Sequence, residues 1–281
     1  MSILPRPAAS DRGLVLRTWP TGETSVIASV LTAEHGLLRL MAKGARQTRS
    51  RLRSLVQPGR LADLEFSLVP DRDLQYLRGG GLILDPLAGA ATLERTAYLL
   101  AALEIVDRCR PGHGHEAGLF VLCQDYVQVL SCADPGRAAA LYYAFEVALL
   151  DLQGMRPLLE ACTQCGRDRD RLADGALWLS PAAGGLVCAD CATGGAAAGA
   201  RPLTASALAL WGDLAAAPAV WPRAALARSD ARDWGVMLHR FLEYHLPGYR
   251  LPTALDLLRA CRGSSTAIRP ALNDIPEEDG G

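Results

Sequence analysis

The feature that most constrains the fold is a change in the spacing of apolar residues near Asp85-Pro86. Before this point apolar and polar residues alternate with a period of two, as in β-strands that have one buried face. After it, apolar residues recur about every 3.6 positions, as they do along one face of an α-helix. We therefore expect a β domain followed by helices.

Five segments before Asp85 have strand-like composition and are separated by turn residues. Five strands within about 75 residues are typical of an OB-type barrel, but SH3-like barrels and partial sandwiches have similar strand counts. Gly79-Gly80-Gly81 is expected to be a hinge that leaves this domain. The expected strands span residues 14–19, 25–32, 37–42, 61–69 and 74–78.

Helical spacing begins after Thr92, a good N-cap residue for a helix that ends near Cys109. Asp134-Pro135 is expected to begin a third helix, because proline is favoured in the first turn. A Gly/Ala stretch at residues 193–200 is interpreted as a flexible connector. Apolar helical stripes are expected at residues 119–130 and 141–152, and further helices at 203–214, 230–246 and 253–261.

Two C-x2-C motifs, Cys162-Cys165 and Cys188-Cys191, are separated by 22 residues. Such paired turns supply the four thiolates of a tetrahedral structural zinc site, which has no open position for catalysis. Residues 176–180 and 186–188 are expected to form a hairpin that carries the second motif. Redox pairs, two disulfides or an iron–sulfur cluster are the alternatives. The other four cysteines are expected to be buried or half-buried free thiols.

The segment from Arg39 to Arg60, here called the basic segment, contains seven cations and no acidic residue. Residues 1–80 hold twelve Lys or Arg and seven Asp or Glu, although the whole chain has a net charge of −1. Uncompensated positive charge on a small barrel favours a nucleic-acid phosphate partner. The alternative is a solvated loop that keeps the protein soluble. The candidate DNA-binding residues are Arg39, Lys43, Arg46, Arg49, Arg51, Arg53 and Arg60.

Several classes of protein lack support in this sequence. No phosphate-binding G-x4-G-K-[ST] motif is present, and neither a G-x-S-x-G elbow nor an H-E-x-x-H metal motif occurs. We therefore expect no enzymatic activity and no nucleotide cofactor. No signal-peptide core and no apolar stretch of about 18 residues is found, so we expect no membrane association.

Two stretches of the chain resemble the RecO family of DNA-repair and recombination mediators. The run GLVLRTWPTGETSVIASVLTAEHGLLRLMAKGARQTRSRL is similar to the family's N-terminal OB domain. CTQCG, followed by W-L-S-P-x-x-G-G-L-V-C-x-x-C, resembles the zinc module of many members. The first stretch begins at Gly13 and the second ends at Cys191, so the two matches enclose residues 13–191. Beyond them, only the helical pattern and H-L-P-G-Y-R-L-P-T agree loosely.

The resemblance implies an α+β multidomain protein: a five-stranded OB-type barrel, then a helical bundle with an inserted four-cysteine zinc ribbon. It also implies binding to single- and double-stranded DNA, annealing of complementary strands, and loading of recombinase with RecR and single-stranded-DNA-binding protein. Lys43, Arg46 and neighbouring arginines would lie in the DNA-binding part. One structural Zn²⁺ and a cytoplasmic, nucleoid-associated location are implied as well. The Gly/Ala stretch and the acidic C-terminal end depart from the family pattern.

The expected organisation has five parts, and two rival functions remain open. A zinc-ribbon transcription accessory protein would share the ribbon and barrel, whereas a metal-dependent nuclease would need clustered carboxylates. The parts are an OB domain (1–83), a helical domain (84–160), a zinc module (161–193), a C-terminal helical part (194–262) and a disordered tail (263–281).

Overall fold

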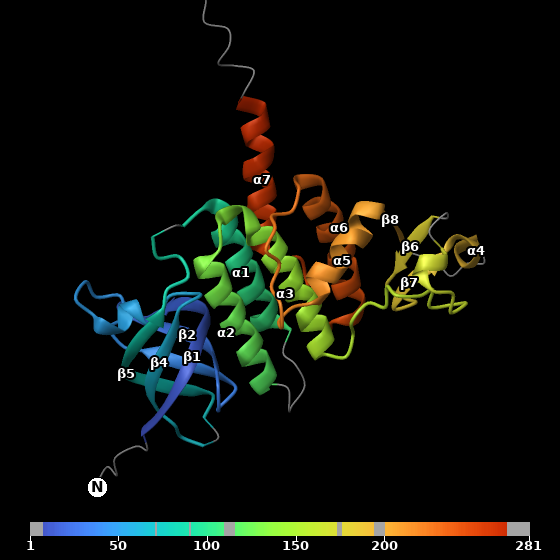
Figure 1. Ribbon diagram of the computed structural model, residues 1–281. Coiled ribbons are helices and arrows are strands. Elements are labelled where there is room, and N and C mark those ends of the chain that lie inside the picture. The colour runs from blue at the N-terminus through green and yellow to red at the C-terminus, as the bar shows by residue number, and fades with distance from the viewer. Residues whose placement is uncertain are drawn as a thin grey trace, which may run out of the picture.

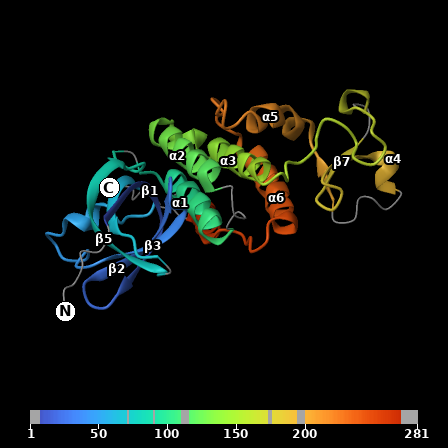
Figure 2. The same ribbon diagram turned by 90° about the horizontal axis from the view of Figure 1, so that it is seen from below.

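The computed structural model describes residues 8–70, 72–89, 91–109, 116–172, 176–193 and 200–268. The chain forms a β-barrel, a central helical bundle and a small module containing the four cysteines. The barrel and the cysteine module lie at opposite ends, with the bundle between them, in both views of the molecule (Figures 1 and 2).

The N-terminal domain is a closed barrel with strand order β1-β2-β3-β5-β4, which confirms the OB-type architecture. Only β3 and β5 pair in parallel, and the other neighbours are antiparallel. The strands are β1 (Ala8–Thr21), β2 (Ser25–Thr32), β3 (Leu37–Ala42), β4 (Leu61–Ser67) and β5 (Leu74–Leu84). The expected strands are confirmed, although β1 and β5 are longer than expected.

The prediction that Gly79-Gly80-Gly81 form a hinge is wrong, because all three residues lie inside β5. β5 pairs with β4 through this stretch, next to an irregularity in the register. Gly80 has φ +147°, and a Cβ there would lie 2.1 Å from the carbonyl oxygen of Asp63. Glycine is needed here for the close approach of two strands.

The barrel has two apolar sides. Val15, Val30 and Phe66 belong to a cluster that fills its interior. On the outside, paired positions place leucines of β4, β1, β2 and β3 in one row, here called the leucine row: Leu61, Leu14, Leu31 and Leu37. This row packs into the same core as the helices, so the barrel and the bundle share a continuous apolar interface.

The bundle is built around α3, which has buried residues on every side and contacts α1, α2, α5 and α6. A helix that is apolar all round belongs in a protein interior. No described helix is long and apolar enough to cross a membrane. The helices are α1 (Leu93–Arg108), α2 (Glu116–Cys132), α3 (Ala138–Leu152), α5 (Ala205–Ala215), α6 (Arg228–His245) and α7 (Thr253–Ile268).

The helix ends agree with the sequence in part. The expected cap at Thr92 is confirmed, since its side chain accepts a hydrogen bond from the Arg95 backbone. Asp134 makes no such bond, and a 3-10 turn, η2 (Pro135–Arg137), precedes α3. α7 continues past the expected end at Cys261. Residues 194–199 of the expected connector and 269–281 of the expected tail lie outside the described residues.

A buried carboxyl group lies within the bundle. Glu146 of α3 is 2% exposed and accepts a hydrogen bond of 2.7 Å from the Tyr142 hydroxyl. Burial raises the pKa of Glu146 to about 8, although the bond from Tyr142 opposes the shift. The folded protein therefore retains a proton that the unfolded chain releases near its ordinary value of 4.5.

This proton makes stability depend on pH. Between about pH 4.5 and pH 8 the unfolded chain binds fewer protons than the folded one, so the free energy of unfolding falls as pH rises. The contribution of one group reaches at most about 1.4 kcal/mol per pH unit. We expect Glu146→Gln to remove this slope and to stabilise the protein relative to wild type near pH 8. Urea unfolding across this range measures the difference.

Glu65→Gln, at an exposed position of β4, is the matched control and should leave the pH profile unchanged. Parallel profiles for wild type and Glu146→Gln would contradict the prediction.

Candidate metal centre and nucleic-acid interface

The four cysteines come from two tight turns that the local sequence favours. Cys162 and Cys165 lie in a turn in which the Gly166 amide donates 2.9 Å to the Cys162 carbonyl. Gly166 has φ +72°, a conformation that glycine adopts without a steric penalty. Cys188 ends strand β7 (Gly185–Cys188), and Cys191 lies in the short turn α4 (Ala189–Cys191).

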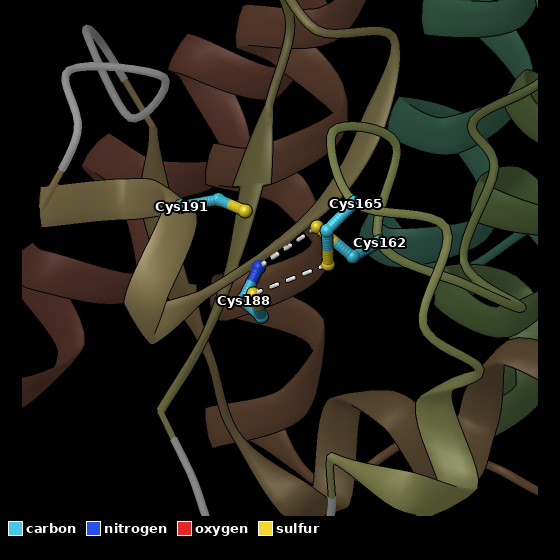
Figure 3. A group of neighbouring side chains, drawn as sticks. All are labelled: Cys162, Cys165, Cys188 and Cys191. Carbon is cyan, nitrogen blue, oxygen red and sulfur yellow. Dashed lines mark hydrogen bonds between the residues drawn. The ribbon is translucent and has the colours of Figure 1, made fainter.

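The expected hairpin is confirmed and extended by a third strand. β6 (Leu177–Ser180) pairs with β7 and also with β8 (Arg201–Leu203), a strand that the sequence pattern did not predict. β8 follows the Gly/Ala stretch and contains Pro202, which is tolerated because β8 is an edge strand. The hairpin fixes Cys188 opposite the first turn (Figure 3).

The thiol groups converge as a metal site requires. The four sulfur atoms lie within 4.8 Å of one another, and the Cys165 and Cys188 sulfurs are 3.8 Å apart (Figure 3). Ligands about 2.3 Å from a tetrahedral metal are separated by about 3.8 Å, so the sulfur spacing fits. The residues proposed from the sequence are therefore positioned together to hold one metal ion.

Backbone amides around Cys162 favour the thiolate form of its side chain. Burial opposes ionisation of Cys162, but amide donors from Cys165, Cys188 and Gln164 lower its pKa to about 6. The amide of Cys188 lies 3.4 Å from the Cys162 sulfur. Metal ligation requires thiolates, so these donors favour the ligating form.

The cysteine module is joined by hydrogen bonds to the segment that follows α3 and to the helix α6. The Leu186 amide donates to the Leu158 carbonyl at 2.8 Å, and the Leu158 amide donates to Gly184 at 3.1 Å. A ring nitrogen of His245, on α6, lies 2.8 Å from the Pro181 carbonyl. The four cysteines therefore lie in a unit that also contacts the C-terminal helix α6.

The remaining cysteines lie apart from this centre. Cys109 and Cys123 are buried, as expected, and burial raises the pKa of the Cys109 thiol to about 11. Cys132 and Cys261 are exposed, so the expectation that they are buried or half-buried is wrong. Cys132 is the last residue of α2, where fewer neighbours cover a side chain, whereas Cys261 lies in the middle of α7.

The basic segment is ordered against the barrel. Ala45, Leu55 and Val56 are buried in the barrel interior cluster, and a 3-10 turn, η1 (Arg51–Ser54), contacts β5. These buried apolar side chains fix the backbone of the segment against the barrel, while its charged side chains remain exposed to solvent. The exposed cations are Arg39, Lys43, Arg46, Arg49, Arg51 and Arg53.

Arg60 differs from the other predicted DNA-binding residues. It is half-buried, donates to the Asp85 carboxylate at 2.7 Å and also donates to the Ser54 carbonyl at 2.6 Å. The pairing with Asp85 was missed because the two residues are 25 positions apart in sequence. The Arg46 guanidinium also has a local partner, since it donates to the Glu23 carbonyl at 3.2 Å.

Barrel, bundle and cysteine module define a multidomain protein with a four-cysteine centre at one end and a cationic surface at the other. Two family descriptions, "Recombination protein O N terminal" and "Recombination protein O C terminal", match residues 7–84 and 90–254. The chain therefore belongs to the RecO family of DNA-repair proteins, as the sequence motifs indicated.

Curated proteins named "DNA repair protein RecO" are similar over most of the chain. The protein from Anaeromyxobacter sp. strain K is 35% identical over 244 residues, covering 85% of this chain and 91% of its own length. The protein from Anaeromyxobacter sp. strain Fw109-5 is 32% identical over 262 residues, which cover 93% of this chain and 97% of that protein. The Frankia casuarinae protein is 32% identical over a match that covers 85% of this chain and 94% of that protein.

The cysteine geometry predicts that metal content depends on both turns. We expect the double variant Cys162→Ser/Cys165→Ser to lose the bound metal and to unfold the module, because metal binding supplies folding free energy. Metal analysis of the purified protein, together with a thermal melt, measures both effects. The control is Cys132→Ser/Cys261→Ser, which changes two exposed cysteines outside the centre. Full metal content in the first variant would contradict the assignment.

Proposed function

We propose that this protein is a non-catalytic recombination mediator that binds DNA through its barrel and anneals complementary single strands. The observation that carries the proposal is the set of six exposed cations that the basic segment holds on an OB-type barrel. Guanidinium groups suit phosphate contacts, because they present planar sets of donors. Membership of the RecO family supports the same role.

The proposal includes the partners that the resemblance implies. The protein acts with RecR and single-stranded-DNA-binding protein to load recombinase at single-stranded gaps, and it works in the cytoplasm in association with the nucleoid. Family membership supports these partners. A transcription accessory role has no corresponding support from the family matches.

The metal in the proposed function is one structural Zn²⁺ held by four cysteines, Cys162, Cys165, Cys188 and Cys191. Four thiolates with tetrahedral spacing favour zinc, and they leave no position open for a reacting water. The metal then acts by holding the two turns of the module together. Nothing in the proposal requires the ion to contact DNA.

The exposed part of the basic segment provides the sharpest test. We expect replacement of Arg46, Arg49, Arg51 and Arg53 by alanine to weaken single-stranded DNA binding and to flatten its salt dependence. If each contacts one phosphate, the log-log slope should change by about 3, at about 0.7 per contact. Titrations at several salt concentrations measure this slope. Because phosphates carry no base identity, unrelated sequences should lose similar affinity.

A matched control removes the same charge from another part of the molecule. Arg223, Arg228, Arg232 and Arg240 are exposed in or near α6, and their replacement by alanine should leave the DNA salt slope unchanged. Thermal stability and metal content should stay near wild type in both variants. An unchanged affinity and slope in the basic-segment variant would show that these arginines only solvate the surface.

Annealing separates the proposal from its rivals. We expect the protein to accelerate pairing of complementary oligonucleotides without ATP, because the sequence lacks a phosphate-binding loop. The assay follows duplex formation by fluorescence, with added Mg²⁺ and a gel for cleavage products. Strand cleavage that requires Mg²⁺ would favour a nuclease, and ATP turnover that copurifies with the protein would contradict the absence of hydrolysis.

A further inference from the structure

Four side chains from neighbouring strands form a second row on the outside of the barrel. Strand pairing places Trp19 of β1 opposite Ile27 of β2, and Ile27 opposite Met41 of β3. Met41 in turn lies opposite Tyr76 of β5. Directly paired residues share one face of a sheet, so these four side chains form one line, here called the outer row.

Strand alternation directs the outer row away from the barrel interior. Ala28, Leu40 and Leu77, each adjacent in sequence to a member of the row, belong to the interior cluster. Successive side chains point to opposite faces, so Ile27, Met41 and Tyr76 point outwards. All four members of the row are half-buried, and neither apolar core of the described residues includes them.

The outer row lies beyond the edge of the helical bundle. Ile27 is four residues from Leu31 of the leucine row, a separation of about 13 Å along a strand. Between the two rows, the Ser29 hydroxyl donates to the Asp107 carboxylate of α1 at 2.6 Å. The helices therefore cover the leucine row and end near Ser29.

Cations border this row at both ends. The Arg17 guanidinium carbon lies 6.0 Å from the centre of the Trp19 ring, and the Lys43 Nζ lies 4.9 Å from that of Tyr76. Arg39, two residues before Met41, is exposed on the same face of β3. Arg17 also lies 4.0 Å from Asp107, a contact that leaves its side chain 67% exposed.

The charge of this face favours an anionic strand as its partner. Lys43 and Arg39 belong to the basic segment, so the outer row borders two of the cations proposed to contact phosphates. On the barrel's other flank, the exposed residues of β4 include Asp63 and Glu65, which repel phosphates. An apolar and aromatic row beside cations is the combination that binds unpaired bases, because bases stack on aromatic rings.

We propose that the outer row is a base-contacting platform for single-stranded DNA, on which Trp19 and Tyr76 stack against bases. This inference rests on the proposed DNA-binding function and adds the residues that recognise a single strand. Bases of a duplex are stacked on one another and do not offer their faces to a protein surface. The row therefore selects single-stranded DNA, whereas the arginines of the basic segment contact phosphates of both single- and double-stranded DNA.

The test compares two single-stranded ligands with the same phosphates: a poly-dT oligonucleotide and an abasic oligonucleotide of equal length. We expect Trp19→Leu/Tyr76→Leu to weaken poly-dT binding at least about tenfold, since each stack contributes a severalfold gain in affinity. Abasic binding and the salt slope should remain as in wild type. Replacement of the four basic-segment arginines should instead weaken the binding of both oligonucleotides and flatten the salt dependence.

Two further variants control for folding and for ring chemistry. Trp19→Phe/Tyr76→Phe keeps the rings and should retain most of the poly-dT affinity. Tyr244→Leu changes a 62% exposed aromatic residue on α6 and should alter nothing. As a second readout, poly-dT should quench tryptophan fluorescence more in wild type than in the folded Trp19→Phe protein.

Three results would overturn the platform. The leucine variant could bind poly-dT as wild type does, or lose affinity equally for both oligonucleotides. It could also lose self-association while keeping its DNA affinity, which would make the row a contact between protein copies. Failure of the proposed function looks different, because wild-type protein would then bind neither oligonucleotide.

Discussion

The contact between the leucine row and the helices determines which part of the barrel is open. Burying a leucine side chain stabilises a fold by about 1.5–3 kcal/mol. Three leucines of the row are buried between barrel and bundle and Leu37 is half-buried, so this contact holds the two domains together firmly. Leu14 and Leu31 are almost fully buried in this contact. Because the strands continue past the joint, the same outer face that binds the bundle emerges beyond it as the outer row. One sheet face thus serves two roles at different positions along its strands.

The ends of the molecule have different physical requirements. The barrel end is held by apolar side chains, so its loops can carry exposed charge without losing their anchor. The cysteine module has strands of only three or four residues, and small units of this kind commonly depend on a metal. A hydrogen bond between Pro181 and His245 connects this unit to α6, and hydrogen bonds with Leu158 connect it to the segment that follows α3. In the proposed function, loss of the Zn²⁺ would therefore disturb the C-terminal helices before it disturbed the barrel.

Local patterns in the sequence predicted most elements, and non-local contacts explain the errors. β4 was evident because its buried and exposed residues alternate, and the cysteine centre was evident because two C-x2-C turns are each local. Gly80 carries no side chain to show alternation, and its role depends on the Asp63 backbone in another strand. β8 is three residues long and depends on β6 for its pairing. The charge of Arg60 is compensated by Asp85, a partner that no spacing rule identifies.

The outer row could not be predicted from the sequence pattern, and it gives the proposed annealing activity a physical basis. Trp19 and Tyr76 are far apart in the chain, and only the barrel register places them on one line with Ile27 and Met41. Cations that hold phosphates and rings that hold base faces both leave the hydrogen-bonding edges of the bases free. A strand held in this way stays extended, yet its edges can still pair with a complement. Pairing restores base stacking within the duplex, which removes the contact with the rings. The surface proposed to hold single strands would therefore release the product that annealing forms.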